Sequence, residues 1–138
     1  MPAKDVYHDC VKNALLKDGW KITHDPYTMT FGAKDVFADL GAEKPLAAEK
    51  GDEKILVEIK SFRGSSDMRD LEIAVGQYVL YRSLITRLEP DRKLFLAVPI
   101  GTYDGILREP IAQPVIEDTQ IEFLVFDPQK EIIIKWTS

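Results

Sequence analysis

The sequence of 138 residues has a single cysteine and no apolar run close to the roughly 20 residues that a membrane-spanning helix needs. One cysteine cannot form a disulfide within the chain, so the composition does not point to an oxidising compartment. The first residues, Met1 to Asp5, lack the basic and then apolar pattern of a secretory signal. The expected location is therefore the cytoplasm, away from membranes.

Several catalytic and binding motifs are also missing. There is no glycine-rich phosphate loop and no Cys-x-x-Cys pair, which argues against a P-loop nucleotide site and against structural zinc. Neither His8 nor His24 has a serine or cysteine nearby in a nucleophile-elbow context. His24 precedes Asp25-Pro26 and is expected in a turn, and Cys10 is expected to be a small buried hydrophobe of the first helix.

A basic excess is missing as well, because the formal net charge is −5. Proteins that hold nucleic acid by neutralising phosphates usually carry net positive charge, so composition alone argues against DNA binding. Segregated charges, or carboxylates that hold a divalent cation against the phosphate, would remove this objection. Five arginines near the long predicted helix could form a phosphate-facing patch or could lie on an ordinary solvated helix face: Arg63, Arg69, Arg82, Arg87 and Arg92.

With 45% apolar and 30% charged residues, the chain fits one globular domain over residues 1–138. Helical and strand periodicities alternate along it. The expected elements are a helix over 4–17, a strand over 20–24, an extended segment over 28–40, a hairpin with arms at 46–48 and 54–62, a helix over 67–88 after an N-cap in 64–66, a buried strand over 94–98, a helical or irregular stretch over 102–119, and strands over 121–126 and 131–136. This order, α-β-β-β-α-β and then a C-terminal β-ribbon, predicts an α/β fold with a mixed central sheet flanked by helices.

The strand over 54–62 carries the main chemical signal. Glu58 and Lys60 share one strand face, while Ile55, Val57 and Ile59 point to the other. Asp39 lies nineteen residues before Glu58. Hydrolysis of a phosphodiester needs a cation that polarises the phosphate and lowers the pKa of the attacking water, and Mg²⁺ accepts one or two carboxylates for that purpose. Asp39 and Glu58 are the candidate metal ligands, and Lys60 is placed to assist the water.

Each of these signals has a plainer interpretation. A Glu-x-Lys pair is common on solvated strand faces, although this strand is too apolar for an edge left to water. Gln77 and Tyr81 lie one turn apart on the apolar side of the long helix, where Gln77 is either a core glutamine or a partner of the Glu58 face. Glu43 and Glu49 are rival ligands, because strand register decides which acid faces Glu58.

Asp39, Glu58-x-Lys60 and a helix with Gln77-x-x-x-Tyr81 together resemble the PD-(D/E)xK nucleases, in particular the RecB-like and archaeal resolvase branch. That resemblance implies a restriction-endonuclease-like core that cuts DNA with Mg²⁺ or Mn²⁺. Asp39 and Glu58 then match the metal ligands, Lys60 the catalytic lysine, and Gln77 and Tyr81 the auxiliary pair. Resolvase-like relatives have a glutamate in the first helix, and the matching position here is His8, which can ligate a metal or relay a proton.

A closer resemblance, to the XisH family, runs nearly end to end. It rests on the stretches Pro2–Asp9, Val11–Leu15, Lys17–Trp20, Thr23–Pro26, Asp39–Lys44, Val57–Phe62, Gly76–Tyr78 and Ile134–Trp136. This family comprises the fdxN element excision controlling factors of cyanobacteria. The resemblance implies a role in the programmed excision of a DNA element during heterocyst differentiation, together with DNA and a small XisI-like partner protein.

Three functions remain open from the sequence. The first is a metal-dependent DNA endonuclease or resolvase-like enzyme. The second is a non-catalytic regulatory subunit that keeps the nuclease fold and binds DNA or protein while a separate recombinase cuts. The third is an assembly subunit without a metal. A homodimer is a further expectation, because the last strand, 131–136, presents a possible sheet edge.

Overall fold

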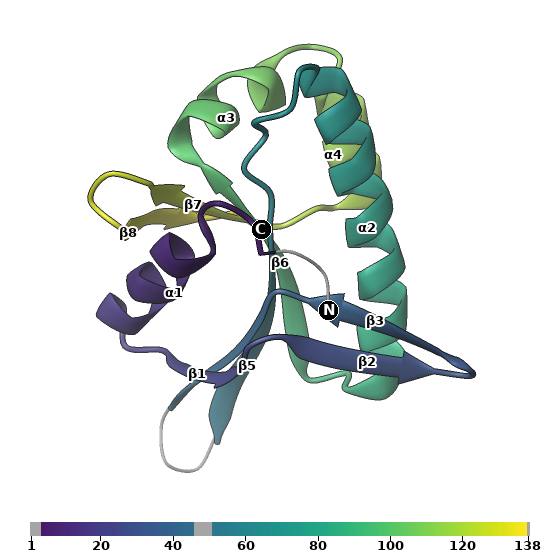
Figure 1. Ribbon diagram of the computed structural model, residues 1–138. Coiled ribbons are helices and arrows are strands. Elements are labelled where there is room, and N and C mark those ends of the chain that lie inside the picture. The colour runs from purple at the N-terminus through teal and green to yellow at the C-terminus, as the bar shows by residue number, and fades with distance from the viewer. Residues whose placement is uncertain (1–3, 46–50, 138) are drawn as a thin grey trace.

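The computed structural model describes residues 4–45 and 51–137 (Figure 1). The elements in chain order are α1 (His8–Lys17), β1 (Lys21–His24), β2 (Tyr27–Phe31), β3 (Lys34–Ala38), β4 (Leu40–Pro45), β5 (Asp52–Ile59), α2 (Asp67–Leu88), β6 (Arg92–Pro99), α3 (Ile100–Asp104), the short 3-10 helix η2 (Ile106–Arg108), α4 (Gln113–Thr119), β7 (Phe123–Asp127) and β8 (Ile132–Trp136). No helix in these two ranges has both the length and the apolar character needed to cross a membrane.

Six strands form one mixed sheet in the order β1-β4-β5-β6-β7-β8. The central strands β5, β6 and β7 run parallel, and the outer neighbours pair antiparallel. Helices α1 and α2 cover opposite faces of this sheet (Figure 1). The α/β class that the sequence predicted is therefore confirmed. The predicted strands over 20–24 and 54–62 correspond to β1 and β5, and the two predicted helices to α1 and α2, whereas β4 was not predicted as a separate strand.

Side-chain alternation along β5 divides the core in two. Ile55, Val57 and Ile59 pack on the α1 side, whereas Leu56 packs on the α2 side. The predicted assignment of strand faces is confirmed. Glu58 therefore shares the α2 face, where it is only 5% exposed. A carboxylate in that position needs a charge partner or a cation, because burial penalises its ionised form.

The segment predicted as one extended stretch over 28–40 is a hairpin. Strands β2 and β3 pair antiparallel as a separate two-stranded sheet, from Tyr27↔Ala38 to Phe31↔Lys34. Gly32 forms the turn with φ +63°, a conformation that glycine adopts at little cost. The hairpin packs on α2 through Met29, which is fully buried (Figure 1). Apolar residues lie on both sides of this turn, so the sequence pattern did not divide the segment into two strands.

Other predicted boundaries also change. The first helix begins at His8 rather than at residue 4, because Tyr7 N–H bonds the Asp5 carboxylate (2.9 Å) and forms a turn. The strand predicted over 54–62 ends at Ile59, and Phe62 adopts φ +55°. The arm that pairs with β5 is β4, and the arm predicted at 46–48 lies outside the described residues, as does Glu49.

The last two strands and the long helix follow the prediction closely. β7 and β8 pair antiparallel as the expected ribbon, and this ribbon extends the central sheet because β7 also pairs with β6. Helix α2 begins after Ser66, whose side chain accepts a hydrogen bond from Arg69 N–H (3.2 Å), so the predicted N-cap is confirmed. Cys10 is buried, as expected, and burial raises the pKa of its thiol to about 11.

Candidate functional site

Strand register brings the two candidate carboxylates together. Leu40 of β4 pairs with Val57 of β5, so the residue before Leu40 lies across from the residue after Val57 in this antiparallel pair. Those residues are Asp39 and Glu58. Asp39 is fixed there because its Oδ2 accepts a hydrogen bond of 2.7 Å from Ile59 N–H.

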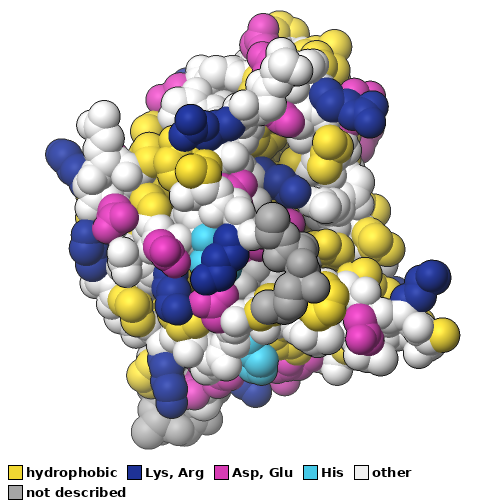
Figure 2. Space-filling view, in the orientation of Figure 1, with side chains coloured by type: hydrophobic (Ala, Val, Ile, Leu, Met, Phe, Trp, Pro, Cys, Tyr) yellow, Lys and Arg dark blue, Asp and Glu magenta, His cyan; other side chains and the backbone are white. Residues whose placement is uncertain are grey.

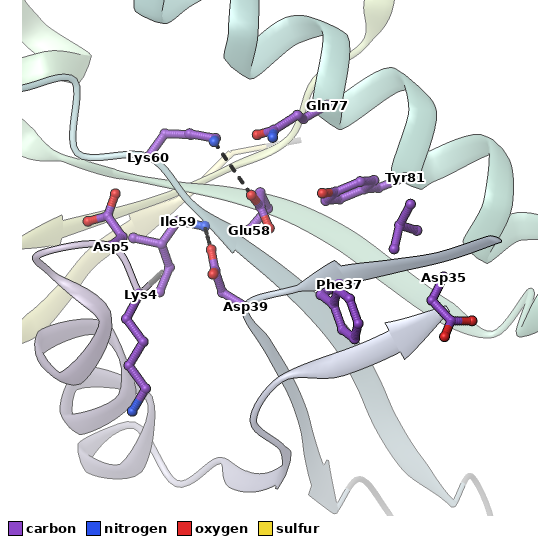
Figure 3. Close-up of a pocket in the computed structure, with 11 residues that line it drawn as sticks. Lys4, Asp5, Asp35, Phe37, Asp39, Glu58, Ile59, Lys60, Gln77 and Tyr81 are labelled. Atoms are coloured by element: carbon purple, nitrogen blue, oxygen red, sulfur yellow. Dashed lines mark hydrogen bonds and ion pairs between the residues drawn. The ribbon is translucent and has the colours of Figure 1, made fainter. Parts of the chain in front are cut away.

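Asp39, Glu58, Lys60, Gln77 and Tyr81 line one pocket with a volume of about 450 Å³ (Figure 3). β5 supplies its floor, the β3 arm of the hairpin one wall and α2 the opposite wall. In Figure 3 the polar ends of Gln77 and Tyr81 point from α2 toward Glu58. The structure thus places five of the predicted site residues around one space.

Charge in the pocket is unbalanced. Four carboxylates and two lysines line it. Burial, followed by the negative charge of Asp39, raises the pKa of Glu58 to about 8, although Lys60 opposes the rise. Burial also raises the pKa of Asp39 above its ordinary value, against the hydrogen bond from Ile59. Lys60 Nζ lies 3.6 Å from Glu58 Oε2, so one ammonium group faces the buried acid Glu58 and the half-buried acid Asp39.

Two buried oxygen atoms at this site have no hydrogen-bond partner: Glu58 Oε1 and Gln77 Oε1. Buried polar atoms are nearly always bonded, and exceptions often mark a site for an ion or ligand. Tyr81 adds a hydroxyl donor, because burial and the charges of Glu58 and Asp39 raise its pKa to about 12. The pocket therefore offers spare acceptors beside a donor that stays protonated at neutral pH.

This donor set fits a hard divalent cation. Mg²⁺ and Mn²⁺ bind carboxylate and amide oxygens and leave other positions to water or phosphate. Asp39 and Glu58 supply the charge, and the free oxygen of Gln77 is of the same hard type. Within residues 4–45 and 51–137, no three His, Cys, Asp or Glu side chains form a complete metal site. A cation held by this pair would therefore need oxygen ligands from water or substrate.

The remaining candidates do not line the pocket, although the charge of His8 opposes the rise that burial causes in the pKa of the Asp39 carboxyl. His8 is buried and its Nε2 lies 2.7 Å from Asp25 Oδ1, so it faces the β1–β2 turn and is not part of the pocket lining. Glu43 pairs with Lys54 in register and reaches Arg92 (3.4 Å), which removes it from the Glu58 position. His24, which was expected in the turn, is instead the last residue of β1, directly before that turn.

The five arginines do not form one basic patch. Arg92 is buried at the start of β6, where it bonds Glu89 and the carbonyl of Ile55, so its predicted phosphate-facing role is wrong. Arg82 bonds carbonyls near the end of α4, and Arg87 bonds Ser83 of its own helix. On the face of the molecule that Figure 2 presents, basic and acidic side chains are intermixed.

Arg63 and Arg69 lie near the entry to α2. The guanidinium of Arg63 lies 6.0 Å from the ring centre of Tyr7, and Arg69 is exposed in the first turn of the helix. Their predicted contact with DNA remains a prediction, as does that of Arg82.

Sequence reasoning missed other residues of the pocket, namely Lys4, Asp5, Asp35 and Phe37. Asp5 accepts a hydrogen bond from Ser61 N–H, 56 residues away (3.1 Å). Contacts over such separations leave no local pattern. The one available signal for Asp35 and Phe37 was their position just before Asp39 in a segment with alternating apolar residues.

Comparisons with known proteins agree with this structure. The family model described as XisH protein matches residues 1–134. An XisH family protein from Nostoc punctiforme is 38% identical, with 97% of this chain and 100% of that chain covered and a TM-score of 0.88. An fdxN element excision controlling factor protein from Anabaena variabilis is 39% identical, with coverages of 98% and 100% and a TM-score of 0.88. A search of curated proteins gave no match.

Proposed function

This chain belongs to the XisH family, and we propose on that premise that it acts in the excision of a DNA element as a metal-dependent endonuclease of the resolvase type. The description of the Anabaena variabilis relative as an excision controlling factor supports the biological role. The observation that carries the chemical role is the pair of half-buried Asp39 and buried Glu58 beside Lys60, with Glu58 Oε1 left without a partner.

Each side chain has a definite part in this proposal. Asp39 and Glu58 would hold Mg²⁺ or Mn²⁺, which would polarise a phosphate and lower the pKa of an attacking water. Lys60, partly exposed at 22%, orients that water or stabilises negative charge on the phosphate oxygens. Gln77 and Tyr81 present an acceptor and a donor from α2, and these position Lys60 or the DNA backbone.

The test uses purified protein with branched and linear DNA in Mg²⁺ and in Mn²⁺. A Glu58→Gln/Lys60→Ala variant is the comparison, because it removes the negative charge of one ligand and the ammonium while keeping similar side-chain volume at position 58. Cleavage by the native protein should exceed that of the variant by 100-fold or more. Equal cleavage by the two proteins rejects the catalytic function.

A non-catalytic subunit is the second candidate. The net charge of −5 and the burial of Arg92 favour it, because both leave little positive surface for a DNA backbone. In this case DNA or a small XisI-like protein is bound and another enzyme cuts. Calorimetric titration with Mn²⁺ and pull-down with the small partner separate the candidates: metal binding and partner capture without cleavage select the regulatory function.

A further inference from the structure

The backbone that follows Lys60 is in an unusual conformation. β5 ends at Ile59, and Lys60 N–H still donates to Ala97 O on β6 (2.9 Å). Two residues later Phe62 adopts φ +55°, a region that a bulky L residue rarely occupies. Such a conformation persists only where surrounding contacts hold it, and it is found more often near functional sites.

Two carboxylates from different elements hold this segment, Ser61–Gly64. Asp5, before α1, accepts from Ser61 N–H (3.1 Å) with one oxygen and from Tyr7 N–H (2.9 Å) with the other. Asp70, in the first turn of α2, accepts from Gly64 N–H (3.0 Å). The segment is therefore tied to the N-terminal stretch at one end and to α2 at the other.

Gly64 belongs to the same arrangement. A Cβ atom at this position would lie 2.7 Å from Asp70 Oδ1 and 3.0 Å from Oδ2. Those distances are too short, so any side chain at position 64 would push the Asp70 carboxylate away from its acceptor position. The absence of a side chain at Gly64 is what lets Asp70 reach the backbone.

The held segment borders the candidate site directly. Asp5 and Lys60 line both the pocket described above and a second hollow of about 310 Å³. The segment forms the wall of that second hollow. Any shift of Ser61 or Phe62 would move the backbone of Lys60, and with it the amine 3.6 Å from Glu58.

We propose that Asp5 and Asp70 are positioning residues, which hold Ser61–Gly64 in its strained form and thereby set Lys60 for the reaction. This inference rests on the proposed endonuclease function. It assigns no metal contact to either residue. A displacement of catalytic groups by about 1 Å can cost as much as 100-fold in rate, so loss of either contact should act mainly on kcat.

The test compares Asp70→Ala, Gly64→Ala and the double variant with native protein in Mn²⁺-dependent DNA cleavage. Each single variant should lower kcat by about 10- to 100-fold, with KM for DNA little changed. The double variant should fall no further than the lower single one, because both changes break one contact. Asp67→Ala is the matched control: it removes the other acidic side chain of the first turn of α2 and should cut like native protein.

Asp5→Ala is tested beside Asp5→Asn, whose carbonyl oxygen can still accept from Ser61 N–H. The alanine variant should lose 10- to 100-fold in kcat, and the asparagine variant should recover part of it. Affinity for Mn²⁺, measured by calorimetry without DNA, should stay within twofold of native in both. A large loss of Mn²⁺ affinity would make Asp5 a metal ligand and overturn the positioning role.

Two further measurements distinguish a failure of the positioning role from a failure of the proposed function. Hydrogen exchange of the amide at position 64 should speed up in Asp70→Ala and in Gly64→Ala, while a thermal melt confirms that each variant is folded. If native protein cuts and the folded variants cut equally well, the positioning role is wrong and the proposed function stands. If native protein cuts no DNA, the proposed function fails, and the inference fails with it.

Discussion

The carboxylate of Asp39 accepts a hydrogen bond of 2.7 Å from the backbone N–H of Ile59, the residue that separates Glu58 from Lys60. One side chain thus holds the turn between β3 and β4 against the strand that carries both other charged groups. The bond needs an oxygen acceptor but no negative charge. Structural and ionic contributions of Asp39 can therefore be separated by substitution.

Asp39→Asn should fold with native stability or slightly above it, because its carbonyl oxygen still accepts from Ile59 N–H while the buried charge is gone. Asp39→Ala should lose roughly 1–2 kcal/mol, since the Ile59 N–H loses its partner. The proposed metal site predicts that Mn²⁺ raises the melting temperature of the native protein, and both variants should lose that rise. Thermal melts with a chelator and with Mn²⁺ provide all three comparisons. A native-sized Mn²⁺ shift in Asp39→Asn contradicts the ligand role.

The second prediction concerns the pH dependence of stability without metal. Burial and the charge of Asp39 raise the pKa of Glu58 from 4.5 to about 8. The folded protein therefore keeps a proton that the unfolded chain releases, and native stability falls as pH rises from about 4.5 to about 8. Glu58→Gln removes this dependence and should be more stable than native protein at pH 8, by roughly 1–3 kcal/mol.

Chelator-treated samples melted between pH 5 and pH 8.5 give the measurement. Glu53→Gln is the control, because Glu53 is an exposed carboxylate on the same strand, β5. Its melting curve should follow that of the native protein at each pH. If Glu58→Gln is no more stable than native at pH 8, the two acids are not held as a costly buried pair.

The third prediction tests the buried arginine. Arg92 has a side chain only 2% exposed, with hydrogen bonds to Glu89 (3.0 Å) and to the carbonyl of Ile55 (2.9 Å). Arg92→Met should lower the free energy of unfolding by roughly 3–5 kcal/mol, because it leaves partly buried acceptors without a donor. Lys93→Met is the matched control: that side chain is 53% exposed, and its loss should cost at most about 1 kcal/mol. Urea titration of both variants measures the difference. Equal losses would mean that Arg92 has no special structural role.

How far the sequence predicts the site depends on the range of each interaction. Alternation along 54–62 was enough to assign Glu58 and Lys60 to one face, because strand periodicity is local. Helical periodicity likewise identified the stripe that carries Gln77 and Tyr81. The choice between Asp39 and Glu43 needed the β4–β5 register, Leu40↔Val57, which two segments set jointly.

Three other features of the structure gave no clear local signal in the sequence. Apolar residues lie on both sides of the turn at Gly32. The sequence pattern therefore predicted one extended segment where the structure has the β2–β3 hairpin. Asp5 bonds Ser61 across 56 residues and had no local signature of a site residue. In the sequence, Arg92 is one of several arginines near the long helix. Its burial depends on its pairing with Glu89 and Glu43 in the folded chain.

The last prediction concerns Gln77, whose Oε1 is buried without a hydrogen-bond partner. Methionine has a similar length and a similar helix propensity, so Gln77→Met keeps the shape of the α2 face and removes the unsatisfied amide. The variant should be as stable as native or gain up to about 1 kcal/mol, because it ends the cost of an unpaired buried oxygen. It should also cut DNA at least tenfold more slowly, since the acceptor beside Glu58 is gone.

Glu72→Met, an exposed substitution on the same helix, is the control for both measurements. Gain in stability with loss of cleavage is expected where a polar group is retained for function. A large loss of stability would instead show that the Gln77 amide serves the fold.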